Sequence, residues 1–317
     1  MTYFKRAQAS ASAYLDIARP DHWFKNIFML PGMALGILIG GIDVDAGIVL
    51  SIVSALVSTC LAASANYTIN EWLDAEFDRF HPTKHTRPSV TGGVTAPGVY
   101  IQWAALLLLS IGLAYTVNHT FVGFIVALLV MGIFYNVNPF RTKDRVHLDV
   151  LTESINNPLR FMLGWCSVNT IQLPPSSILV AYWMGGAYLM TVKRYSEYRH
   201  IGSAETAALY RRSFRYYNEN NLLLAAFFYA LTAAFFIGVF LIKYRIEYIL
   251  AMPLLALLFV WYLHMGMARD SVAQRPEKLY RETGFLALLA FTLGVILLLT
   301  FIDIPVLGIL LETRLRH

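Results

Sequence analysis

Long apolar runs separated by short polar segments follow one another along the whole 317-residue chain. A helix needs about 20 apolar residues to cross a bilayer, and hydrocarbon requires each segment to satisfy its own backbone hydrogen bonds. We therefore expect an all-α polytopic membrane protein with residues 1–317 forming one membrane domain. The apolar runs predict nine transmembrane helices, at about 27–41, 47–69, 98–117, 120–138, 148–168, 174–193, 220–243, 247–267 and 283–303.

The composition and the placement of charge support this interpretation. Charged residues make up 14% of the chain, against about 25% in soluble domains, and the mean hydropathy is +0.54. A net charge of +5 could suggest nucleic acid, but 20 of the 25 Lys and Arg residues fall on one side of the predicted spans. Because cytoplasmic loops carry the positive excess, we expect a cytoplasmic N-terminus and no nucleic-acid partner. The two cysteines lie inside predicted spans, which indicates neither a disulfide framework nor a thiolate metal site.

The second apolar run is followed by an acidic segment, NEWLDAEFDRFHPTKHTRP, at residues 70–88. If the helix continues to residue 78, Asn70, Asp74 and Asp78 share one face, with Glu71 beside them. Close carboxylates repel each other unless a cation lies between them, and Mg²⁺ prefers such oxygen ligands together with substrate phosphates. We therefore predict Mg²⁺ ligands at Asn70, Glu71, Asp74 and Asp78; the alternative is a solvated acidic helix end.

Basic residues accompany this segment at the predicted inner side. Lys84 and Arg87 follow the acids, and Lys25 precedes the first span together with Trp23. Lys and Arg beside a metal–diphosphate site would bind phosphate oxygens, so all three are candidate substrate-binding residues. Ordinary inside-positive loop charge and an interfacial anchor are the alternatives.

Two further polar groups fall on the fifth and sixth predicted spans. Within the fifth, a polar stripe recurs at helical spacing: Asp149, Glu153, Asn156 or Asn157, and Arg160. A polar stripe facing lipid would be costly, so it must face protein or a cavity, and Glu153, Asn157 and Arg160 are candidate substrate-binding residues. For this stripe there are two alternatives to substrate binding: a buried structural network and the ion pathway of a transporter. The sixth span ends in a mainly cationic group formed by Lys193, Arg194, Tyr195 and Glu197. This group fits phosphate binding, and Glu197 could also bind a metal.

Together these motifs resemble the UbiA superfamily of intramembrane prenyltransferases over nearly the whole chain. The family motif Asn-Asp-x-x-Asp-x-x-x-Asp appears here with Glu71 in its second position. The resemblance implies a nine-helix bundle in a bacterial inner membrane, with a polar cavity facing the cytoplasm and Mg²⁺ at Asn70, Asp74 and Asp78.

The second motif departs from the usual aspartate-rich pattern of that family. Lys193-Arg194-Tyr195-x-Glu197, together with Arg19-Pro20-x-x-Trp23-x-Lys25-Asn26, resembles a branch that moves phosphoribose from phosphoribosyl pyrophosphate to a polyprenyl phosphate. The resemblance therefore implies this reaction, with those two compounds as substrates. A conventional prenyl transfer from a prenyl diphosphate to an aromatic or other small acceptor is the alternative, and the unusually charged stretch 135–165 keeps it open. The oligomeric state is left open as well.

Overall fold

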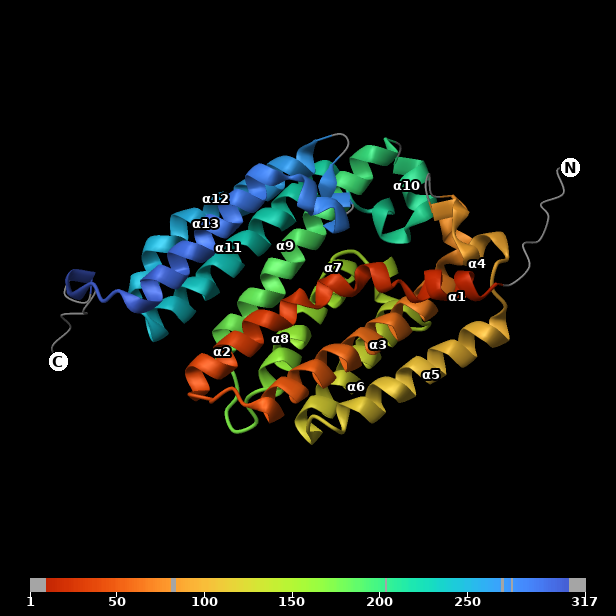
Figure 1. The fold of residues 1–317 in the computed structure, drawn as a ribbon. Helices are drawn as coiled ribbons and strands as arrows, with labels where there is room; N and C mark the ends of the chain where they lie inside the picture. Colours follow the sequence, from red (N-terminus) through yellow and green to blue (C-terminus); the bar gives the residue numbers. More distant parts are fainter. Residues whose placement is uncertain (1–9, 81–83, 203, 269–270, 275, 308–317) are drawn as a thin grey trace, which may run out of the picture. The chain divides into compact units, whose positions relative to one another are not determined.

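The computed structural model describes residues 10–80, 84–202, 204–268, 271–274 and 276–307, and these ranges contain helices and no strand. The expected all-α class is confirmed (Figure 1). The residues form two compact units, Met1–Pro174 with Ile201–Glu219 and Pro175–His200 with Asn220–His317. The single domain expected over residues 1–317 stays a prediction.

The first unit contains the α-helices up to α8 together with α10, and four 3₁₀ helices labelled η. Its elements are α1 Ala11–Ala18, η1 Pro20–Met29, α2 Leu30–Gly40, α3 Ala46–Asp78, η2 Lys84–Thr86, α4 Pro88–Thr91, α5 Ala96–Ala114, α6 His119–Asn136, η3 Thr142–Asp144, α7 Leu148–Ser154, α8 Asn156–Cys166, α10 Ala204–Tyr210 and η4 Arg212–Arg215. The second unit contains α9 Ser176–Ile201, α11 Glu219–Tyr244, η5 Ile246–Ala251, α12 Met252–Met267, η6 Val272–Gln274, η7 Pro276–Arg281 and α13 Thr283–Phe301.

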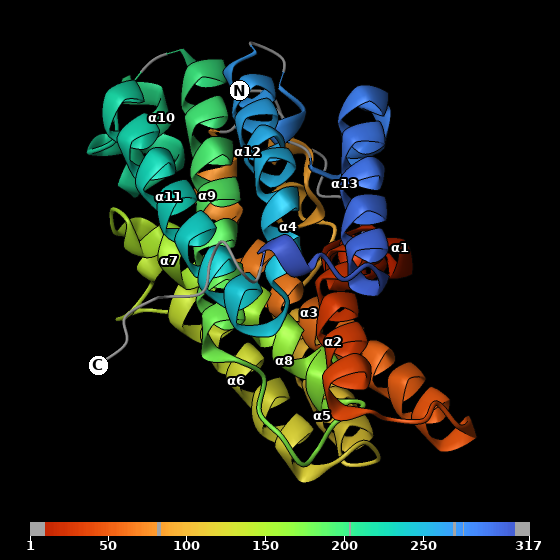
Figure 2. The same ribbon diagram turned by 90° about the vertical axis from the view of Figure 1, so that its left-hand side faces the viewer.

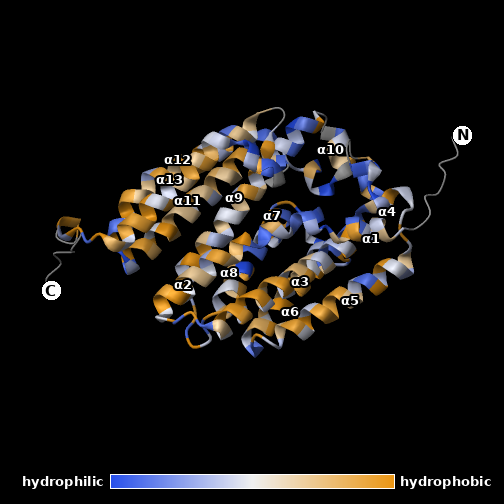
Figure 3. Cartoon of the chain, viewed as in Figure 1, coloured by the Kyte–Doolittle hydropathy of each residue, from blue (hydrophilic) through white to orange (hydrophobic). Residues whose placement is uncertain are grey.

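Seven helical segments are long and apolar enough to cross a membrane, and they match seven of the nine predicted spans. They are Ala11–Gly40, Ala46–Asp78, Ala96–Ala114, His119–Asn136, Glu219–Tyr244, Ile246–Met267 and Thr283–Phe301. Figure 3 shows hydrophobic residues along most of α5 and α6, and hydrophilic residues on α10. The protein is therefore an integral membrane protein, although the count of nine spans is not confirmed.

The two remaining predicted spans differ from a simple apolar helix for identifiable reasons. The span predicted at 148–168 divides into α7 and α8 at Ile155. Pro158 has no N–H to donate to the carbonyl of Ser154, so a continuous helix would lose a bond there. The span predicted at 174–193 is one long helix, α9, whose C-terminal half carries many polar residues.

Helix α3 is the central element of the first unit and runs without interruption through residue 78, as predicted. Asp45 caps its N-terminus by accepting from the Ile48 N–H at 2.8 Å. Figures 1 and 2 show α3 beside α5 and α6. Reciprocal hydrogen bonds join α3 to α5: each of Ser58 and Ser110 donates its hydroxyl to the other's backbone carbonyl, at 2.8 and 2.9 Å. Small polar residues of this kind let membrane helices approach closely.

Glycines bring α2 and α8 into backbone contact. A Cβ atom at Gly32 would lie 2.1 Å from the carbonyl oxygen of Phe161, and one at Gly164 would lie 2.0 Å from that of Met29. Neither position has room for a side chain. This close approach fixes α8, which carries Arg160, against the η1–α2 segment.

Candidate active site

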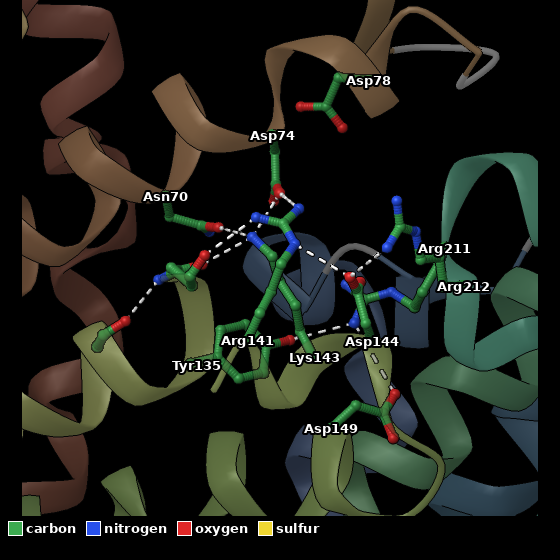
Figure 4. A network of polar contacts seen from close by, with 12 residues as sticks. Asn70, Asp74, Asp78, Tyr135, Arg141, Lys143, Asp144, Asp149, Arg211 and Arg212 are labelled. Atoms are coloured by element: carbon green, nitrogen blue, oxygen red, sulfur yellow. Dashed lines mark hydrogen bonds and ion pairs between the residues drawn. The ribbon is translucent and has the colours of Figure 1, made fainter. Parts of the chain in front are cut away.

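The acidic face of α3 lies where the sequence predicted it. Asn70, Asp74 and Asp78 are presented at successive turns of one helix, and Figure 4 shows all three side chains on the side facing α6 and the loop after it. Glu71 and Asp78 are buried, at 4% and 2% exposure. Buried carboxylates require compensating charge or hydrogen bonds, so their partners define what the site can do.

Arg87 binds both buried acids, Glu71 and Asp78. Its Nη1 donates to Asp78 Oδ2 at 2.6 Å, and its Nε lies 3.8 Å from Glu71 Oε2. Ser89 donates its hydroxyl to Glu71 Oε1 at 3.1 Å. Arg87 therefore lies at the acidic face, as predicted, and its charge compensates two carboxylates.

The remaining acid, Asp74, is bound by two cations from the loop between α6 and α7. Arg141 Nη2 donates to Asp74 Oδ1 at 3.0 Å, and Lys143 Nζ donates to the same oxygen. Lys143 also reaches Asn70 Oδ1 at 3.2 Å and Asn136 Oδ1 at 2.8 Å (Figure 4). Sequence reasoning missed both cations, although the stretch 135–165 stood out as unusually charged.

Lys143 is only 3% exposed. Burial lowers the pKa of its ammonium group to about 8, while Asp74 opposes that shift. The group therefore remains mainly protonated at neutral pH. It is a buried cation held against the predicted metal ligands.

The loop that carries these cations has an unusual backbone. Arg141 has φ 28° and His147 has φ 62°, values that non-glycine residues rarely adopt and that cost about 1–3 kcal/mol each. Arg141 is held by Asn136 O at 3.0 Å, by Asp144 Oδ2 at 3.1 Å and by the ring of Phe77, 4.8 Å below its guanidinium. These contacts keep the strained residue in place, which indicates a functional rather than incidental geometry.

Asp149, a third buried acid, anchors the loop between α6 and α7 to the segment after α10. Asp149 is 0% exposed and accepts hydrogen bonds from Tyr217 Oη at 2.7 Å and Ser213 Oγ at 3.2 Å. Arg211 lies 3.8 Å from it and donates to Tyr135 Oη at 3.2 Å. Tyr217 Oη also accepts from the His147 N–H at 2.7 Å. This network connects α6 and the loop after it to the segment after α10. No local periodicity in the sequence reveals that connection.

A polar cavity of about 50 Å³ opens beside Asn70 within the first unit. It is formed by α3, α6, α7 and α8 and is lined by Ala63, Asn66, Tyr67, Asn70, Leu128, Gly132, Tyr135, Asn136, Glu153, Asn156 and Arg160. The polar stripe was predicted to face protein or a cavity, and its members Glu153 and Arg160 line this cavity. Of the two asparagines that the spacing left open, Asn156 lines the cavity and Asn157 is not among its lining residues.

The other predicted binding residues are placed as follows. Lys25 lies 5.5 Å from the ring centre of Tyr67, a cavity-lining residue, and Lys84 begins η2. In the second unit, Arg194 Nη1 donates to Glu197 Oε2 at 2.6 Å, and both side chains are buried. Tyr195 is buried and Lys193 half-buried on the same helix. The carboxylate of Glu197 is thus compensated by Arg194, and its role as a metal ligand stays a prediction.

The donor chemistry of the acidic face fits Mg²⁺. Asn70 Oδ1 and Asp74 Oδ1 converge on one cation, the Lys143 ammonium, so the two oxygens can share a positive ion. Amide and carboxylate oxygens are the ligands that Mg²⁺ takes. No cluster of three or more His, Cys, Asp or Glu side chains suited to a metal occurs among the residues described.

These features define a class: an all-helical integral membrane protein with a polar site built on an Asn-Glu-x-x-Asp-x-x-x-Asp helix face. Residues 28–289 match the UbiA prenyltransferase family. The chain belongs to that family, which is a family of transferases.

Relatives and solved structures agree with this assignment. The chain is 29% identical over 217 residues to a decaprenyl-phosphate phosphoribosyltransferase of Corynebacterium glutamicum, covering 67% of this chain and 62% of the relative. It is 32% identical over 208 residues to one of Mycobacterium tuberculosis, covering 64% and 65%. The matched region thus spans a little under two thirds of these relatives. A UbiA homolog from Archaeoglobus fulgidus, bound to GPP and Mg²⁺, has the same fold at a TM-score of 0.67 and 21% identity, covering 90% of this chain and 99% of that one.

Proposed function

We propose that the protein transfers phosphoribose from phosphoribosyl pyrophosphate to a polyprenyl phosphate and releases pyrophosphate. The observation that carries this proposal is the pair of buried cations, Arg141 and Lys143, held on the acidic face at Asp74. A diphosphate leaving group needs metal-binding oxygens and cations side by side. The relatives named decaprenyl-phosphate phosphoribosyltransferase support phosphoribose as the transferred group and a polyprenyl phosphate as its acceptor.

The chain's own residues have separable tasks in this reaction. Asn70, Asp74 and Asp78, with Glu71 beside them, would hold Mg²⁺, which would neutralise diphosphate charge. Arg141 and Lys143, which lie at Asp74, would bind the diphosphate oxygens, and Lys84 and Arg87 would extend the same positive surface. A phosphate oxygen of the lipid attacks ribose C1 as the bond from C1 to the diphosphate oxygen breaks, and pyrophosphate leaves with the electron pair. The attacking phosphate is already an anion, so no general base is required.

The remaining predicted residues belong to the same proposal. Lys25, Glu153, Asn157 and Arg160 in the first unit, and Lys193, Arg194 and Tyr195 in the second, are assigned to substrate binding. Glu197 is assigned to a second metal ion. From the positive-inside pattern we also propose that the N-terminus and the site face the cytoplasm at a bacterial inner membrane.

A transfer assay tests the proposal directly. Membranes containing the protein are incubated with radiolabelled phosphoribosyl pyrophosphate, polyprenyl phosphate and Mg²⁺, and labelled lipid is measured. We expect label in the lipid, its loss on adding EDTA and its return with excess Mg²⁺. Absence of Mg²⁺-dependent labelled lipid contradicts the proposal.

Prenyl transfer from a prenyl diphosphate to a small acceptor is the second candidate. It is favoured by the shared fold of the Archaeoglobus fulgidus homolog, which is bound to GPP and Mg²⁺. The same membranes incubated with labelled geranyl diphosphate and an aromatic acceptor distinguish the two. A labelled prenylated acceptor, without labelled phosphoribosyl lipid, would establish this second function instead.

The substitution Asp74→Asn tests the acidic face. It keeps the shape of the side chain and removes the charge that binds Mg²⁺ and the two cations, so we expect transfer to fall below detection. The protein should still purify as a folded species by size-exclusion chromatography in detergent. Transfer at the wild-type rate would exclude Asp74 as a metal ligand.

A further inference from the structure

The polar cavity beside Asn70 extends along α3 away from the acidic face. Its lining runs from Asn70 back to Ala63 on that helix, a distance of about 10 Å at 1.5 Å per residue. The cavity therefore has one end at the predicted metal ligands and another deeper in the bundle. The deeper end is where α8 places Arg160.

Arg160 is a buried cation without an acidic partner. It is 7% exposed, its Nε donates to the neutral Asn26 Oδ1 at 3.0 Å, and its Nη1 lies 3.5 Å from the backbone carbonyl of Asn156. Within the described parts of the chain it forms no ion pair, and Asn26 itself is engaged with Cys60 Sγ at 3.1 Å. A buried charge left without a counter-ion is costly. Glu153 lines the same cavity but forms no ion pair with Arg160, so the guanidinium can take an anion from a ligand.

The same cavity holds acceptors without donors. Asn156 Oδ1 is buried and receives no hydrogen bond. The carboxylate of Glu153, which also lines the cavity, forms neither an ion pair nor a hydrogen bond with any residue in the described ranges. A matching ligand must therefore donate hydrogen bonds to Glu153 and Asn156 as well as present an anion to Arg160.

We propose that this cavity binds a phosphorylated sugar, with Arg160 holding its phosphate monoester and Glu153 and Asn156 accepting from its hydroxyls. The inference rests on the proposed function and identifies how the donor is selected. Asn70, at the other end of the cavity, contacts the cation cluster that receives the diphosphate. A prenyl chain has neither hydroxyls nor a second phosphate, so it satisfies none of these three groups.

A phosphate monoester could come from the sugar or from the polyprenyl phosphate, and binding measurements separate the two. The full-length protein in lipid nanodiscs is titrated with ribose 5-phosphate, with inorganic phosphate and, separately, with polyprenyl phosphate. The variants are Arg160→Met and Glu153→Gln, with Arg215→Met as the matched control, because Arg215 is exposed on η4 away from the cavity lining.

We expect Arg160→Met to raise the Kd for ribose 5-phosphate at least tenfold and to leave polyprenyl phosphate binding unchanged. Glu153→Gln should weaken ribose 5-phosphate and leave inorganic phosphate unaffected, since only the hydroxyl acceptor is altered. Arg215→Met should bind all three ligands like the wild type. The unliganded Arg160→Met protein should unfold close to the wild-type temperature, because the substitution removes an uncompensated buried charge but also the hydrogen bond to Asn26 Oδ1.

Two results overturn the assignment while leaving the proposed function intact. Both apply when the wild type transfers phosphoribose. In the first, Arg160→Met binds ribose 5-phosphate like the wild type. In the second, Arg160→Met loses affinity only for polyprenyl phosphate. If the wild type neither transfers phosphoribose nor binds ribose 5-phosphate, both the proposed function and this inference fail.

Discussion

At the scale of single residues, the site is a set of compensated charges. Asp74 is shared by Arg141 and Lys143, and Asp78 is bound by Arg87. Each carboxylate that could bind Mg²⁺ is thus paired with a cation that could bind phosphate. In the proposed reaction, a metal–diphosphate complex would supply a cation for these carboxylates and an anion for these cations, so that each charge keeps an opposite partner.

Lys143 is the residue whose loss should affect transfer most selectively. Lys143→Met removes the buried ammonium group that we propose binds the leaving group, and keeps most of the length of the side chain. We expect kcat/KM for phosphoribosyl pyrophosphate to fall by about 100-fold or more, measured by labelled-lipid formation. Arg145→Met, at an exposed position two residues further on, serves as the control. Equal, small effects of the two substitutions would contradict a specific role for Lys143.

Among the elements, the site depends on the loop between α6 and α7 and on helix α8, and tertiary contacts hold both of them in place. The loop carrying Arg141 and Lys143 is fixed at its far end by Asp149, which is bound in turn by the segment after α10. On the other side of the cavity, α8 is fixed by its glycine contact with the η1–α2 segment. Both supports act on the functional side chains without touching a substrate.

Tyr217→Phe tests the support at Asp149. The substitution removes the hydroxyl that binds Asp149 and the His147 N–H, leaving two polar groups without that partner. We expect the free energy of unfolding to fall by about 1–3 kcal/mol and amide exchange to increase around residues 141–149. Tyr216→Phe is the control, because Tyr216 is 66% exposed. Unchanged exchange in Tyr217→Phe would show that the loop is held by other contacts.

Gly164→Ala tests the approach of α8 to the η1–α2 segment. The added methyl group would meet the Met29 carbonyl, so the helices must separate, and overpacking of this kind costs about 1–3 kcal/mol. We expect a lower unfolding temperature in detergent. Gly123→Ala in α6, where a Cβ meets nothing within 4 Å, should leave it unchanged or raise it slightly. The idea of a tight helix contact fails if both variants behave alike.

At the scale of the whole molecule, the protein is a membrane-embedded member of the UbiA prenyltransferase family whose family match runs from residue 28 to residue 289. The match extends over both compact units. The polar residues predicted for function lie at the ends or breaks of apolar helices, such as the end of α3 and the division between α7 and α8. Irregular and polar backbone within a membrane protein is tolerated where it lines a cavity.

The predicted orientation is open to a labelling test. Single cysteines replace Asp43, between α2 and α3, and Arg145, between α6 and α7, in a protein lacking its two native cysteines. Both positions are exposed. We expect a membrane-impermeant maleimide to label the residue 145 variant in inside-out vesicles and the residue 43 variant in right-side-out vesicles. The opposite pattern would reverse the orientation and place the site outside the cytoplasm.

The helical class, seven of the membrane spans and the continuation of α3 to Asp78 could be predicted from the sequence, because hydrophobic runs and the 3.6-residue period are local properties. The same period identified the common face of Asn70, Asp74 and Asp78. The packing of the helices, and not the sequence pattern, reveals that Arg141 and Lys143, 67 and 69 residues away from Asp74, lie on that face. It also reveals which of the two asparagines, Asn156, lines the cavity, and that Arg160 forms no ion pair with any residue that the structure describes. Such pairings depend on how buried charges find compensation when the helices pack, and no spacing along the chain records that.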